Sequence, residues 1–215
     1  MSEPLCEQRD FIIEAALIYV PFYGWSWKAL EKAGVDLAND AILARRLFTS
    51  DLSLAADHFA DWSDRRMKTE LEKVDLMAMR VRERIHTCVK IRIALNSPNK
   101  EAIRRLLSFL SLPHNAGLVT RITWRSCSAI WYAIGDRSTD WNYYSKRAIL
   151  ASVYLSTIMF WLSDEGNESG DFPETWAFLD RRIDNVLKTF GLFGRLKTHV
   201  SDFPKLFIQR HRNAL

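Results

Sequence analysis

The chain has 215 residues, with 30 Lys and Arg against 26 Asp and Glu, a formal net charge of +4 and 48% hydrophobic residues. With only 8 Gly and 6 Pro, this composition is typical of one or two folded domains and excludes disordered and collagen-like classes. Cys6, Cys88 and Cys127 lie far apart and form no C-x-x-C pair. The cysteines therefore support neither a disulfide scaffold nor a cysteine zinc site, and they favour an intracellular protein.

The start of the chain carries no recognisable targeting pattern. Glu3, Glu7 and Asp10 interrupt any apolar signal core and do not fit an acid-poor transit peptide. The longest apolar stretch, around residues 148–162, contains Ser152 and Ser156 and is shorter than the roughly 20 residues that a bilayer requires. If this protein meets a membrane, we expect it to lie on the surface.

Apolar residues recur at helical spacing almost throughout, and no stretch alternates with period two, so the sequence predicts an all-α protein. We expect Ser26 and Asn39 to be N-caps, Ser97-Pro98-Asn99 to be a break, and glycines such as Gly191 to be joints. The predicted helices are 9–23, 26–32, 39–48, 51–71, a basic helix around 80–92, 100–112, 115–134, 140–162, 173–190 and 192–212.

Charge divides the chain unevenly. Residues 1–64 carry 11 acids and 5 bases, a net charge of −6, so the remainder carries +10. We predict three parts: a three-helix unit over 1–60, a helical ligand-binding domain over 61–190, and an amphipathic C-terminal helix over 191–215, with the first boundary inside a continuous helix.

The N-terminal pattern resembles the helix-turn-helix of tetracycline-repressor-type regulators. It consists of an amphipathic helix, a short helix ending in Lys32-Ala33-Gly34-Val35, and a further short helix with Arg45 and Arg46. DNA binding depends on neutralising phosphates, which a segment of net charge −6 does poorly. We therefore expect the fold without nucleic-acid binding, and a ligand-responsive transcription regulator is the alternative.

No catalytic pattern stands out. Glu83 and His86 form an E-x-x-H, but a di-iron bundle needs two such pairs and two further Glu, and the chain has no second pair. There is no phosphate-binding glycine loop and no nucleophile elbow. We predict a protein that is not an enzyme, with no cofactor, no metal and no catalytic residue.

Apolar side chains after residue 100 exceed what a thin helical layer needs. They are compatible with core packing or with a dry cavity for a long apolar ligand. The candidate lipid-binding residues are Leu106, Phe109, Leu110, Leu118, Ile122, Leu150, Val153, Tyr154, Thr157, Phe160 and Phe178.

The tail combines an apolar stripe with cations, as an anionic membrane surface requires. Docking on its own domain or exchange within a dimer is the alternative, and Pro204 should kink or restart the helix. The candidate membrane-binding residues are Leu192, Leu196, Val200, Phe203, Phe207, Arg195, Lys197, Lys205 and Arg210.

The most specific text in the chain is Gly135-Asp136-Arg137-Ser138-Thr139-Asp140-Trp141-Asn142-Tyr143-Tyr144-Ser145-Lys146-Arg147. It resembles the signature of the ubiquinone-biosynthesis accessory protein family, the ninth member of the coenzyme Q gene series. Leu112-Pro113-His114-Asn115, the segment Asp171-Phe172-Pro173-Glu174-Thr175-Trp176, and Gly24-Trp25 fit the same family, in order, over most of the chain.

The resemblance implies a tetracycline-repressor-like fold that binds lipids, including ubiquinone precursors, in its C-terminal domain. It also implies a terminal amphipathic helix that rests on the membrane, and presentation of the quinone intermediate to a di-iron demethoxyubiquinone hydroxylase or an equivalent ring hydroxylase. The expected partners are thus a polyprenylated quinone precursor or phospholipid, this hydroxylase, a membrane surface and a second copy in a homodimer. The expected location is peripheral, on the cytoplasmic face of the bacterial inner membrane or the matrix face of a mitochondrial one.

Carried onto this sequence, the resemblance assigns a patch that contacts the hydroxylase. Aromatic residues so close together cannot all point inward, so part of this patch should be exposed. The sequence departs from the family in having Tyr143 where the family has Trp, and Trp141 where it has Phe. The candidate partner-binding residues are Ser128, Ile130, Trp131, Tyr143, Tyr144 and Arg147.

Overall fold

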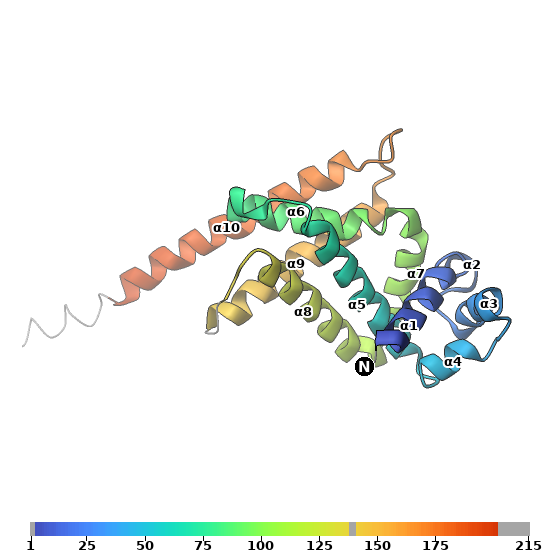
Figure 1. The fold of residues 1–215 in the computed structure, drawn as a ribbon. Helices are drawn as coiled ribbons and strands as arrows, with labels where there is room; N and C mark the ends of the chain where they lie inside the picture. The colour runs from blue at the N-terminus through green and yellow to red at the C-terminus, as the bar shows by residue number, and fades with distance from the viewer. Residues whose placement is uncertain (1–2, 138–140, 202–215) are drawn as a thin grey trace, which may run out of the picture.

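The computed structural model describes residues 3–137 and 141–201. The side chains of residue 3, of 141 and 142 at the start of α9, and of 187 and 189–201 in α10 are not included. The described residues form ten α-helices and three short 3-10 turns, with no strand among them, which confirms the all-α prediction (Figure 1). The elements are α1 (Glu3–Ala16), α2 (Val20–Tyr23), α3 (Trp27–Ala38), α4 (Leu43–Leu47), α5 (Leu52–Leu71), η1 (Leu76–Ala78), α6 (Val81–Ala94), η2 (Ser97–Asn99), α7 (Lys100–Leu110), η3 (Pro113–Asn115), α8 (Ala116–Ala133), α9 (Trp141–Ser163) and α10 (Pro173–Ser201).

Helices α1–α4 gather at one end of the molecule (Figure 1). The single helix predicted over 9–23 is wrong in its bounds: α1 begins at Glu3 and ends at Ala16, and α2 resumes at Val20. Pro21 lies in the first turn of α2, where its missing N–H costs nothing, whereas inside a continuous helix it would lose a hydrogen bond and clash with the preceding turn. Gly24 then ends α2 with φ +68°, a backbone conformation that favours glycine.

The turn between α3 and α4 corrects the role of Asn39. It lies after the last residue of α3, with φ +51°, and its N–H donates to the Val35 carbonyl, so Asn39 is a C-cap and not the predicted N-cap. Asn is one of the few residues that tolerate this left-handed conformation. Gly34 does not end the helix; it lies within α3, where a Cβ would come within 2.5 Å of the Asp40 carbonyl oxygen. Only glycine, which has no Cβ, allows the backbone at Asp40 to pass this close to α3.

Helix α5 joins the N-terminal helices to the rest of the molecule and packs against α1, α6 and α8. Its N-cap is Asp51, whose carboxylate accepts a hydrogen bond from the Ser53 N–H at 2.9 Å, an arrangement typical of Asp at this position. Because α5 is unbroken from Leu52 to Leu71, the boundary expected near residue 60 falls inside a helix. The division into three parts stays a prediction.

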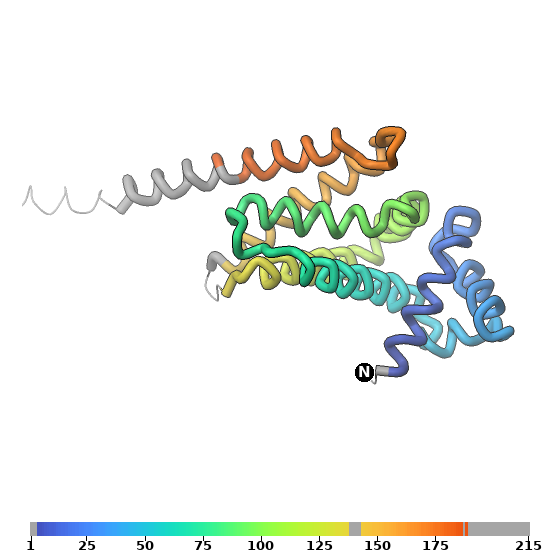
Figure 2. The backbone as a smooth tube through the Cα atoms, turned by 45° about the horizontal axis from the view of Figure 1, so that its top comes forward, coloured from blue at the N-terminus to red at the C-terminus, as the bar shows by residue number. Residues whose placement is uncertain are grey.

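The remaining helices form the larger part of the molecule, with α10 packed along α6 and α9 (Figure 2). The joint predicted at Gly191 is wrong, because α10 continues without a break from Pro173 to Ser201. A single glycine inside a helix costs only about 1 kcal/mol relative to alanine, which the flanking turns can absorb. Within the described part of the chain, none of the helices has the length and apolar character needed to cross a bilayer.

Candidate functional site

A cavity of about 730 Å³ lies between α5, α6, α7, α8 and α9. Each helix contributes the apolar face that its period directs inward; on α7 this face includes Ile103, Leu106 and Leu110, all buried. Helix α9 closes the opposite side with Ile158 and Leu162. The volume falls within the range of about 300–1,000 Å³ that small-molecule pockets occupy.

One wall of the cavity is polar and buried. Arg92 of α6 donates through Nε to Asp64 Oδ1 at 2.8 Å, and the Ser126 hydroxyl of α8 donates to the same oxygen at 2.9 Å. The side chains of Asp64 and Arg92 are only 4% and 7% exposed. Each charged group is therefore stabilised by its partner rather than by water. Tyr154 lines this wall as well, and burial raises its pKa to about 12, which keeps the phenol neutral.

Asn96 adds an acceptor to the polar wall. Its side-chain N–H donates to the Arg92 carbonyl at 2.9 Å, but its Oδ1 is buried and accepts no hydrogen bond from the described residues. An unsatisfied buried acceptor costs about 1–3 kcal/mol, which a ligand carrying an O–H or N–H would recover. The wall can therefore receive one polar group at the end of an otherwise apolar molecule.

The cavity opens to solvent between α7 and α9. Ser108 and Ser111 on one side, and Leu155 and Met159 on the other, line the cavity and are exposed. Met159 is 62% exposed and Leu155 37%. The α9 side of this rim is apolar and can guide a hydrocarbon chain, whereas the α7 side carries the two serines and Arg104, which donates to the Leu162 carbonyl.

Four of the eleven predicted lipid-binding residues line this cavity: Leu106, Leu110, Ile122 and Tyr154. Phe109 and Leu118 instead line a second, smaller cavity beside Asp51 and His114. The other five pack elsewhere in the structure. Leu150, Val153 and Thr157 are buried on another face of α9, and Phe160 stacks on Phe178 at a centroid distance of 4.5 Å.

Of the α9 residues predicted to bind lipid, only Tyr154 lines this cavity. Leu155, Ile158 and Met159 face the cavity, and each lies only one or two positions from a predicted residue. One position rotates a side chain by about 100° around the helix axis, so a small shift in phase moves a residue out of the cavity. The same spacing of three and four residues would have found this second stripe, but α9 is apolar on most sides, so period alone could not choose between them.

The patch predicted to contact a hydroxylase divides into exposed and buried members. Tyr144 is 57% exposed and Tyr143 half-buried; their rings meet edge to face at 5.1 Å, and Trp124 lies 6.0 Å from Tyr144. Tyr132, not predicted, is 59% exposed, and its hydrogen bond with Tyr143 raises its pKa. We call Trp124, Tyr132, Tyr143 and Tyr144 the aromatic surface cluster.

Ile130 and Arg147 have no exposed surface, so neither side chain touches a partner in this conformation. Arg147 lies beneath the aromatic surface cluster: its Nε donates to Ser128 Oγ at 3.0 Å, its Nη1 donates to the Tyr143 carbonyl at 2.9 Å, and its guanidinium covers the Tyr143 ring at 3.4 Å. Trp131 is half-buried and donates to the Lys146 carbonyl. Arg147 thus orients the cluster, since the planar guanidinium can stack and donate at once.

The predicted membrane-binding residues fall on or beyond the end of α10. Leu192, Arg195, Leu196, Lys197 and Val200 lie on its helical backbone, and their side chains are outside the description. Phe203, Lys205, Phe207 and Arg210 lie outside the described residues altogether.

The E-x-x-H pair is engaged in packing. The Glu83 carboxylate accepts the Arg80 N–H at 2.9 Å as part of the first turn of α6, and His86 faces Asp180 of α10 at 3.9 Å. Glu83, His86 and Asp180 line one small cavity, but among the described residues their donor atoms do not form a group close enough to hold a metal ion. A different cluster, which the sequence did not suggest, does converge: Cys6, Asp10 and His58.

Comparison with known structures defines the class of fold. A TetR transcriptional regulator from Nitrosomonas europaea superimposes with a TM-score of 0.65 at 23% sequence identity, over 82% of this chain and 95% of that one. The protein is thus a TetR-like all-α protein with a cavity between the helices that follow its N-terminal unit.

Sequence comparison defines the family. Residues 116–189 match the family model described as COQ9. The chain is 30% identical over 193 residues to the human ubiquinone biosynthesis protein COQ9, mitochondrial, which covers 86% of this chain and 59% of the human one. It is 26% identical over 210 residues to the probable ubiquinone biosynthesis protein coq9 of Dictyostelium discoideum, over 95% and 67% of the two chains. The chain belongs to the COQ9 family, and it spans about three fifths of the length of the human relative.

Proposed function

We propose that this protein is a non-enzymatic accessory protein of ubiquinone biosynthesis, which binds a polyprenylated quinone or phenol precursor in the cavity and presents it to a ring hydroxylase. The observation that carries the proposal is the division of the cavity into one buried polar wall and a mainly apolar remainder that opens beside the apolar residues Leu155 and Met159. A small polar ring on a long hydrocarbon tail has the same division. The relatives named for ubiquinone biosynthesis support the choice of ring.

The cavity geometry favours an orientation for this ligand. The polar ring would lie against Arg92, Asn96 and Tyr154, with the tail directed toward Leu155 and Met159 at the mouth. Because the cavity is too small for a long isoprenoid chain, the far end of the tail would extend through the mouth. A cavity of this kind replaces the bilayer as the surroundings of the apolar chain, which lowers the free-energy cost of removing the lipid from the membrane.

The aromatic surface cluster is the proposed contact for the hydroxylase. Large, partly exposed aromatic side chains held by a buried arginine are typical of the residues that dominate the binding energy of protein interfaces. The C-terminal part of the chain is the proposed contact for the membrane, because its apolar stripe is flanked by Arg and Lys. These assignments give a peripheral protein at the inner membrane face where the hydroxylase works, and a homodimer would be compatible with the TetR-like fold.

The test is to identify what the protein carries. Purified protein is extracted with organic solvent, and the extract is analysed by mass spectrometry for the wild type, for Met159→Arg and for Met77→Arg. Met159 lies at the mouth, Met77 does not line the cavity, and the two are 62% and 61% exposed, so both substitutions should leave the fold intact. We expect a polyprenylated quinone or phenol in the wild type and in Met77→Arg, and much less of it in Met159→Arg.

Other results would revise the proposal. Phospholipid alone would support lipid binding but contradict a ligand with a quinone or phenol ring. An extract without lipid from folded wild-type protein would contradict lipid binding, and the ligand-responsive transcription regulator would become the better assignment.

A further inference from the structure

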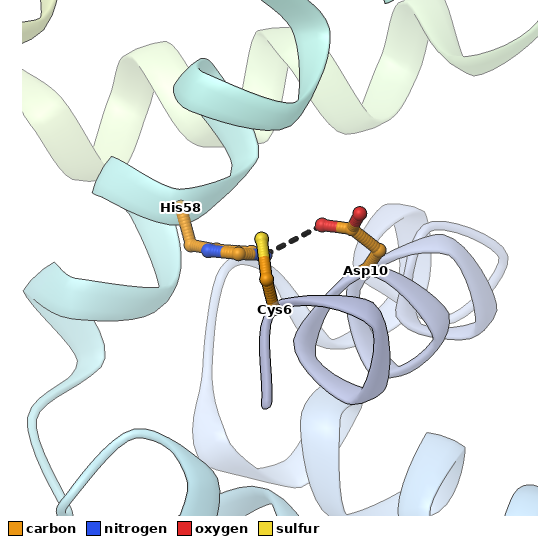
Figure 3. A group of neighbouring side chains, drawn as sticks. All are labelled: Cys6, Asp10 and His58. Carbon is orange, nitrogen blue, oxygen red and sulfur yellow. Dashed lines mark hydrogen bonds and ion pairs between the residues drawn. The ribbon is translucent and has the colours of Figure 1, made fainter. Parts of the chain in front are cut away.

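We propose that Cys6, Asp10 and His58 form a binding site for a divalent transition-metal ion of the Zn²⁺ class, where α1 packs on α5 (Figure 3). One donor atom from each residue lies within 4.8 Å of the other two. Tetrahedral zinc with bonds of about 2.0–2.3 Å holds its donors about 3–4 Å apart, so the three side chains need only small rotations to enclose an ion.

The two helices bring the donors together by simple geometry. Cys6 and Asp10 are four residues apart on α1 and so lie on one face of that helix, the face that packs on α5. His58 comes from α5, and its Nε2 lies 2.7 Å from Asp10 Oδ1. Figure 3 shows the Asp10 carboxylate facing the end of the imidazole ring, with the Cys6 sulfur next to that end in this view, in agreement with donor separations within 4.8 Å.

The donor set suits a transition metal. His58 offers an imidazole nitrogen and Asp10 a carboxylate oxygen. Cys6 is a free, half-buried cysteine. Sulfur, nitrogen and oxygen donors together match zinc and its neighbours rather than calcium or magnesium.

Arg65 is the group that competes with the ion, because its two terminal nitrogens donate to Asp10 at 2.6 and 2.7 Å. Arg65 also donates through Nε to Asp61 Oδ2 at 2.9 Å, which fixes it from the other side. An ion on Asp10 Oδ1 would replace the contact from Nη2 and leave those to Oδ2 and Asp61. Arg65 would then hold the carboxylate in place, as outer-shell groups do at metal sites.

The charges and protons balance. The ion brings two positive charges. The Asp10 carboxylate supplies one negative charge, and Cys6 supplies the other when its thiol releases a proton to solvent on metal binding. His58 stays neutral, with its proton moving from Nε2 to Nδ1 as Nε2 takes the metal. The site is then neutral apart from the Arg65 and Asp61 pair, and a water molecule would complete four-coordination.

The site would join two parts of the fold. His58 is followed by Phe59 and Ala60, which line the cavity, while Cys6 and Asp10 belong to the N-terminal helices. A bound ion would therefore fix α1 against the helix that forms one wall of the cavity, and would stabilise this junction as a ligand that binds only the folded state.

The experiment is a metal titration of the full, untagged chain. Protein treated with a chelator and dialysed is titrated with Zn²⁺ in competition with a chromophoric chelator, and separately with Co²⁺ to record the sulfur-to-cobalt charge-transfer absorption. We expect one ion per chain and the thiolate absorption in the wild type. Cys6→Ser should lose that absorption, and Cys6→Ser and His58→Gln should each weaken Zn²⁺ binding by about 100-fold or more, beyond the 10–100-fold effect of an outer-shell residue.

His114→Gln is the matched control, since His114 is exposed and belongs to the second, smaller cavity beside η3; its titration should equal that of the wild type. Circular dichroism verifies that each variant is folded. The wild-type titration decides the proposal even if a variant fails to fold: binding of less than one ion per chain overturns it. Unchanged affinity in folded Cys6→Ser or His58→Gln overturns the assignment of these ligands.

Discussion

Tyr144 is the residue through which the proposed partner contact can be tested most directly. Its ring is 57% exposed and rests on Tyr143 and Trp124, so a substitution changes the surface more than the core. We expect Tyr144→Lys to weaken hydroxylase binding by about 2 kcal/mol or more, as at an interface hot spot, measured by calorimetry or pull-down with purified hydroxylase.

The control for Tyr144→Lys is Phe22→Lys. Phe22 is 81% exposed on α2, at the opposite end of the molecule from the start of α9 (Figure 1). It should leave hydroxylase binding unchanged, and neither variant should alter the lipid content. Loss of lipid from Tyr144→Lys with normal partner affinity would contradict the assignment of the aromatic surface cluster.

Asp64 supports the polar wall of the cavity through its contact with the buried Arg92. We expect Asp64→Ala to lower the free energy of unfolding by about 3–5 kcal/mol, because it leaves a buried guanidinium without a counter-charge. Asp57→Ala on the same helix removes a more exposed pair with Arg125 and should cost only about 1 kcal/mol. Urea unfolding measures both; equal effects would mean that Arg92 finds another partner or water.

At the scale of elements, α10 is fixed on α6 by polar groups that respond to pH. Arg82 forms a two-point contact with Asp184, and His86 faces Asp180. Burial lowers the pKa of His86, with a further contribution from Lys90 and Arg82, and the nearby Asp180 only partly opposes these effects. On acidification His86 becomes protonated in the unfolded chain first, near pH 6.5, because its pKa is lower in the folded protein. The contribution of neutral His86 to the stability of the fold is therefore fully present above that pH. It is lost as the pH falls through the lower pKa of the folded state.

We therefore expect the free energy of unfolding to fall with acidification below about pH 6.5 in the wild type, and to fall less in His86→Gln. The measurement is urea unfolding over a pH series, with the exposed His114→Gln as a control that should follow the wild type. Parallel wild-type and His86→Gln curves would show that α10 does not depend on this histidine.

The junction between α9 and α10 depends on one carboxylate. Asp164 accepts hydrogen bonds from the Thr175 N–H and hydroxyl and from the Gly166 N–H, so it closes the loop and caps the first turn of α10. This cap could not be predicted from the sequence, because Asp164 and Thr175 are eleven positions apart.

At the scale of the whole molecule, the charge of the N-terminal unit bears on nucleic-acid binding. Arg45 pairs with Glu31 and Arg46 with Asp40, so the two cations of α4 are already neutralised within the fold. We expect duplex DNA to bind more weakly than the roughly 10⁻⁴–10⁻⁶ M of non-specific DNA-binding proteins, measured by fluorescence anisotropy at low and moderate salt. Tight, strongly salt-dependent binding would favour the transcription regulator.

Membrane contact is the second property of the whole molecule. We expect Phe203→Asp to reduce sedimentation with anionic liposomes, because it places a carboxylate in the proposed apolar stripe and removes apolar area from the bilayer interface. Asn213→Asp adds the same charge off the stripe and should have a much smaller effect, on the order of the 1 kcal/mol that one charge contributes near the surface. Equal sedimentation of Phe203→Asp and wild type would place Phe203 in a protein contact.

The sequence by itself determined the helical class, most helix positions and the family, because each depends on residues close together in the chain or on motifs read in order. Only the tertiary structure decided which stripe of α9 faces the cavity, that Asp64, Arg92 and Ser126 from three helices form its polar wall, and that Ile130 and Arg147 are buried. It also decided that Cys6 and Asp10 meet His58. Helical period fixes which residues share a face, but the packing of one helix on another fixes what that face touches.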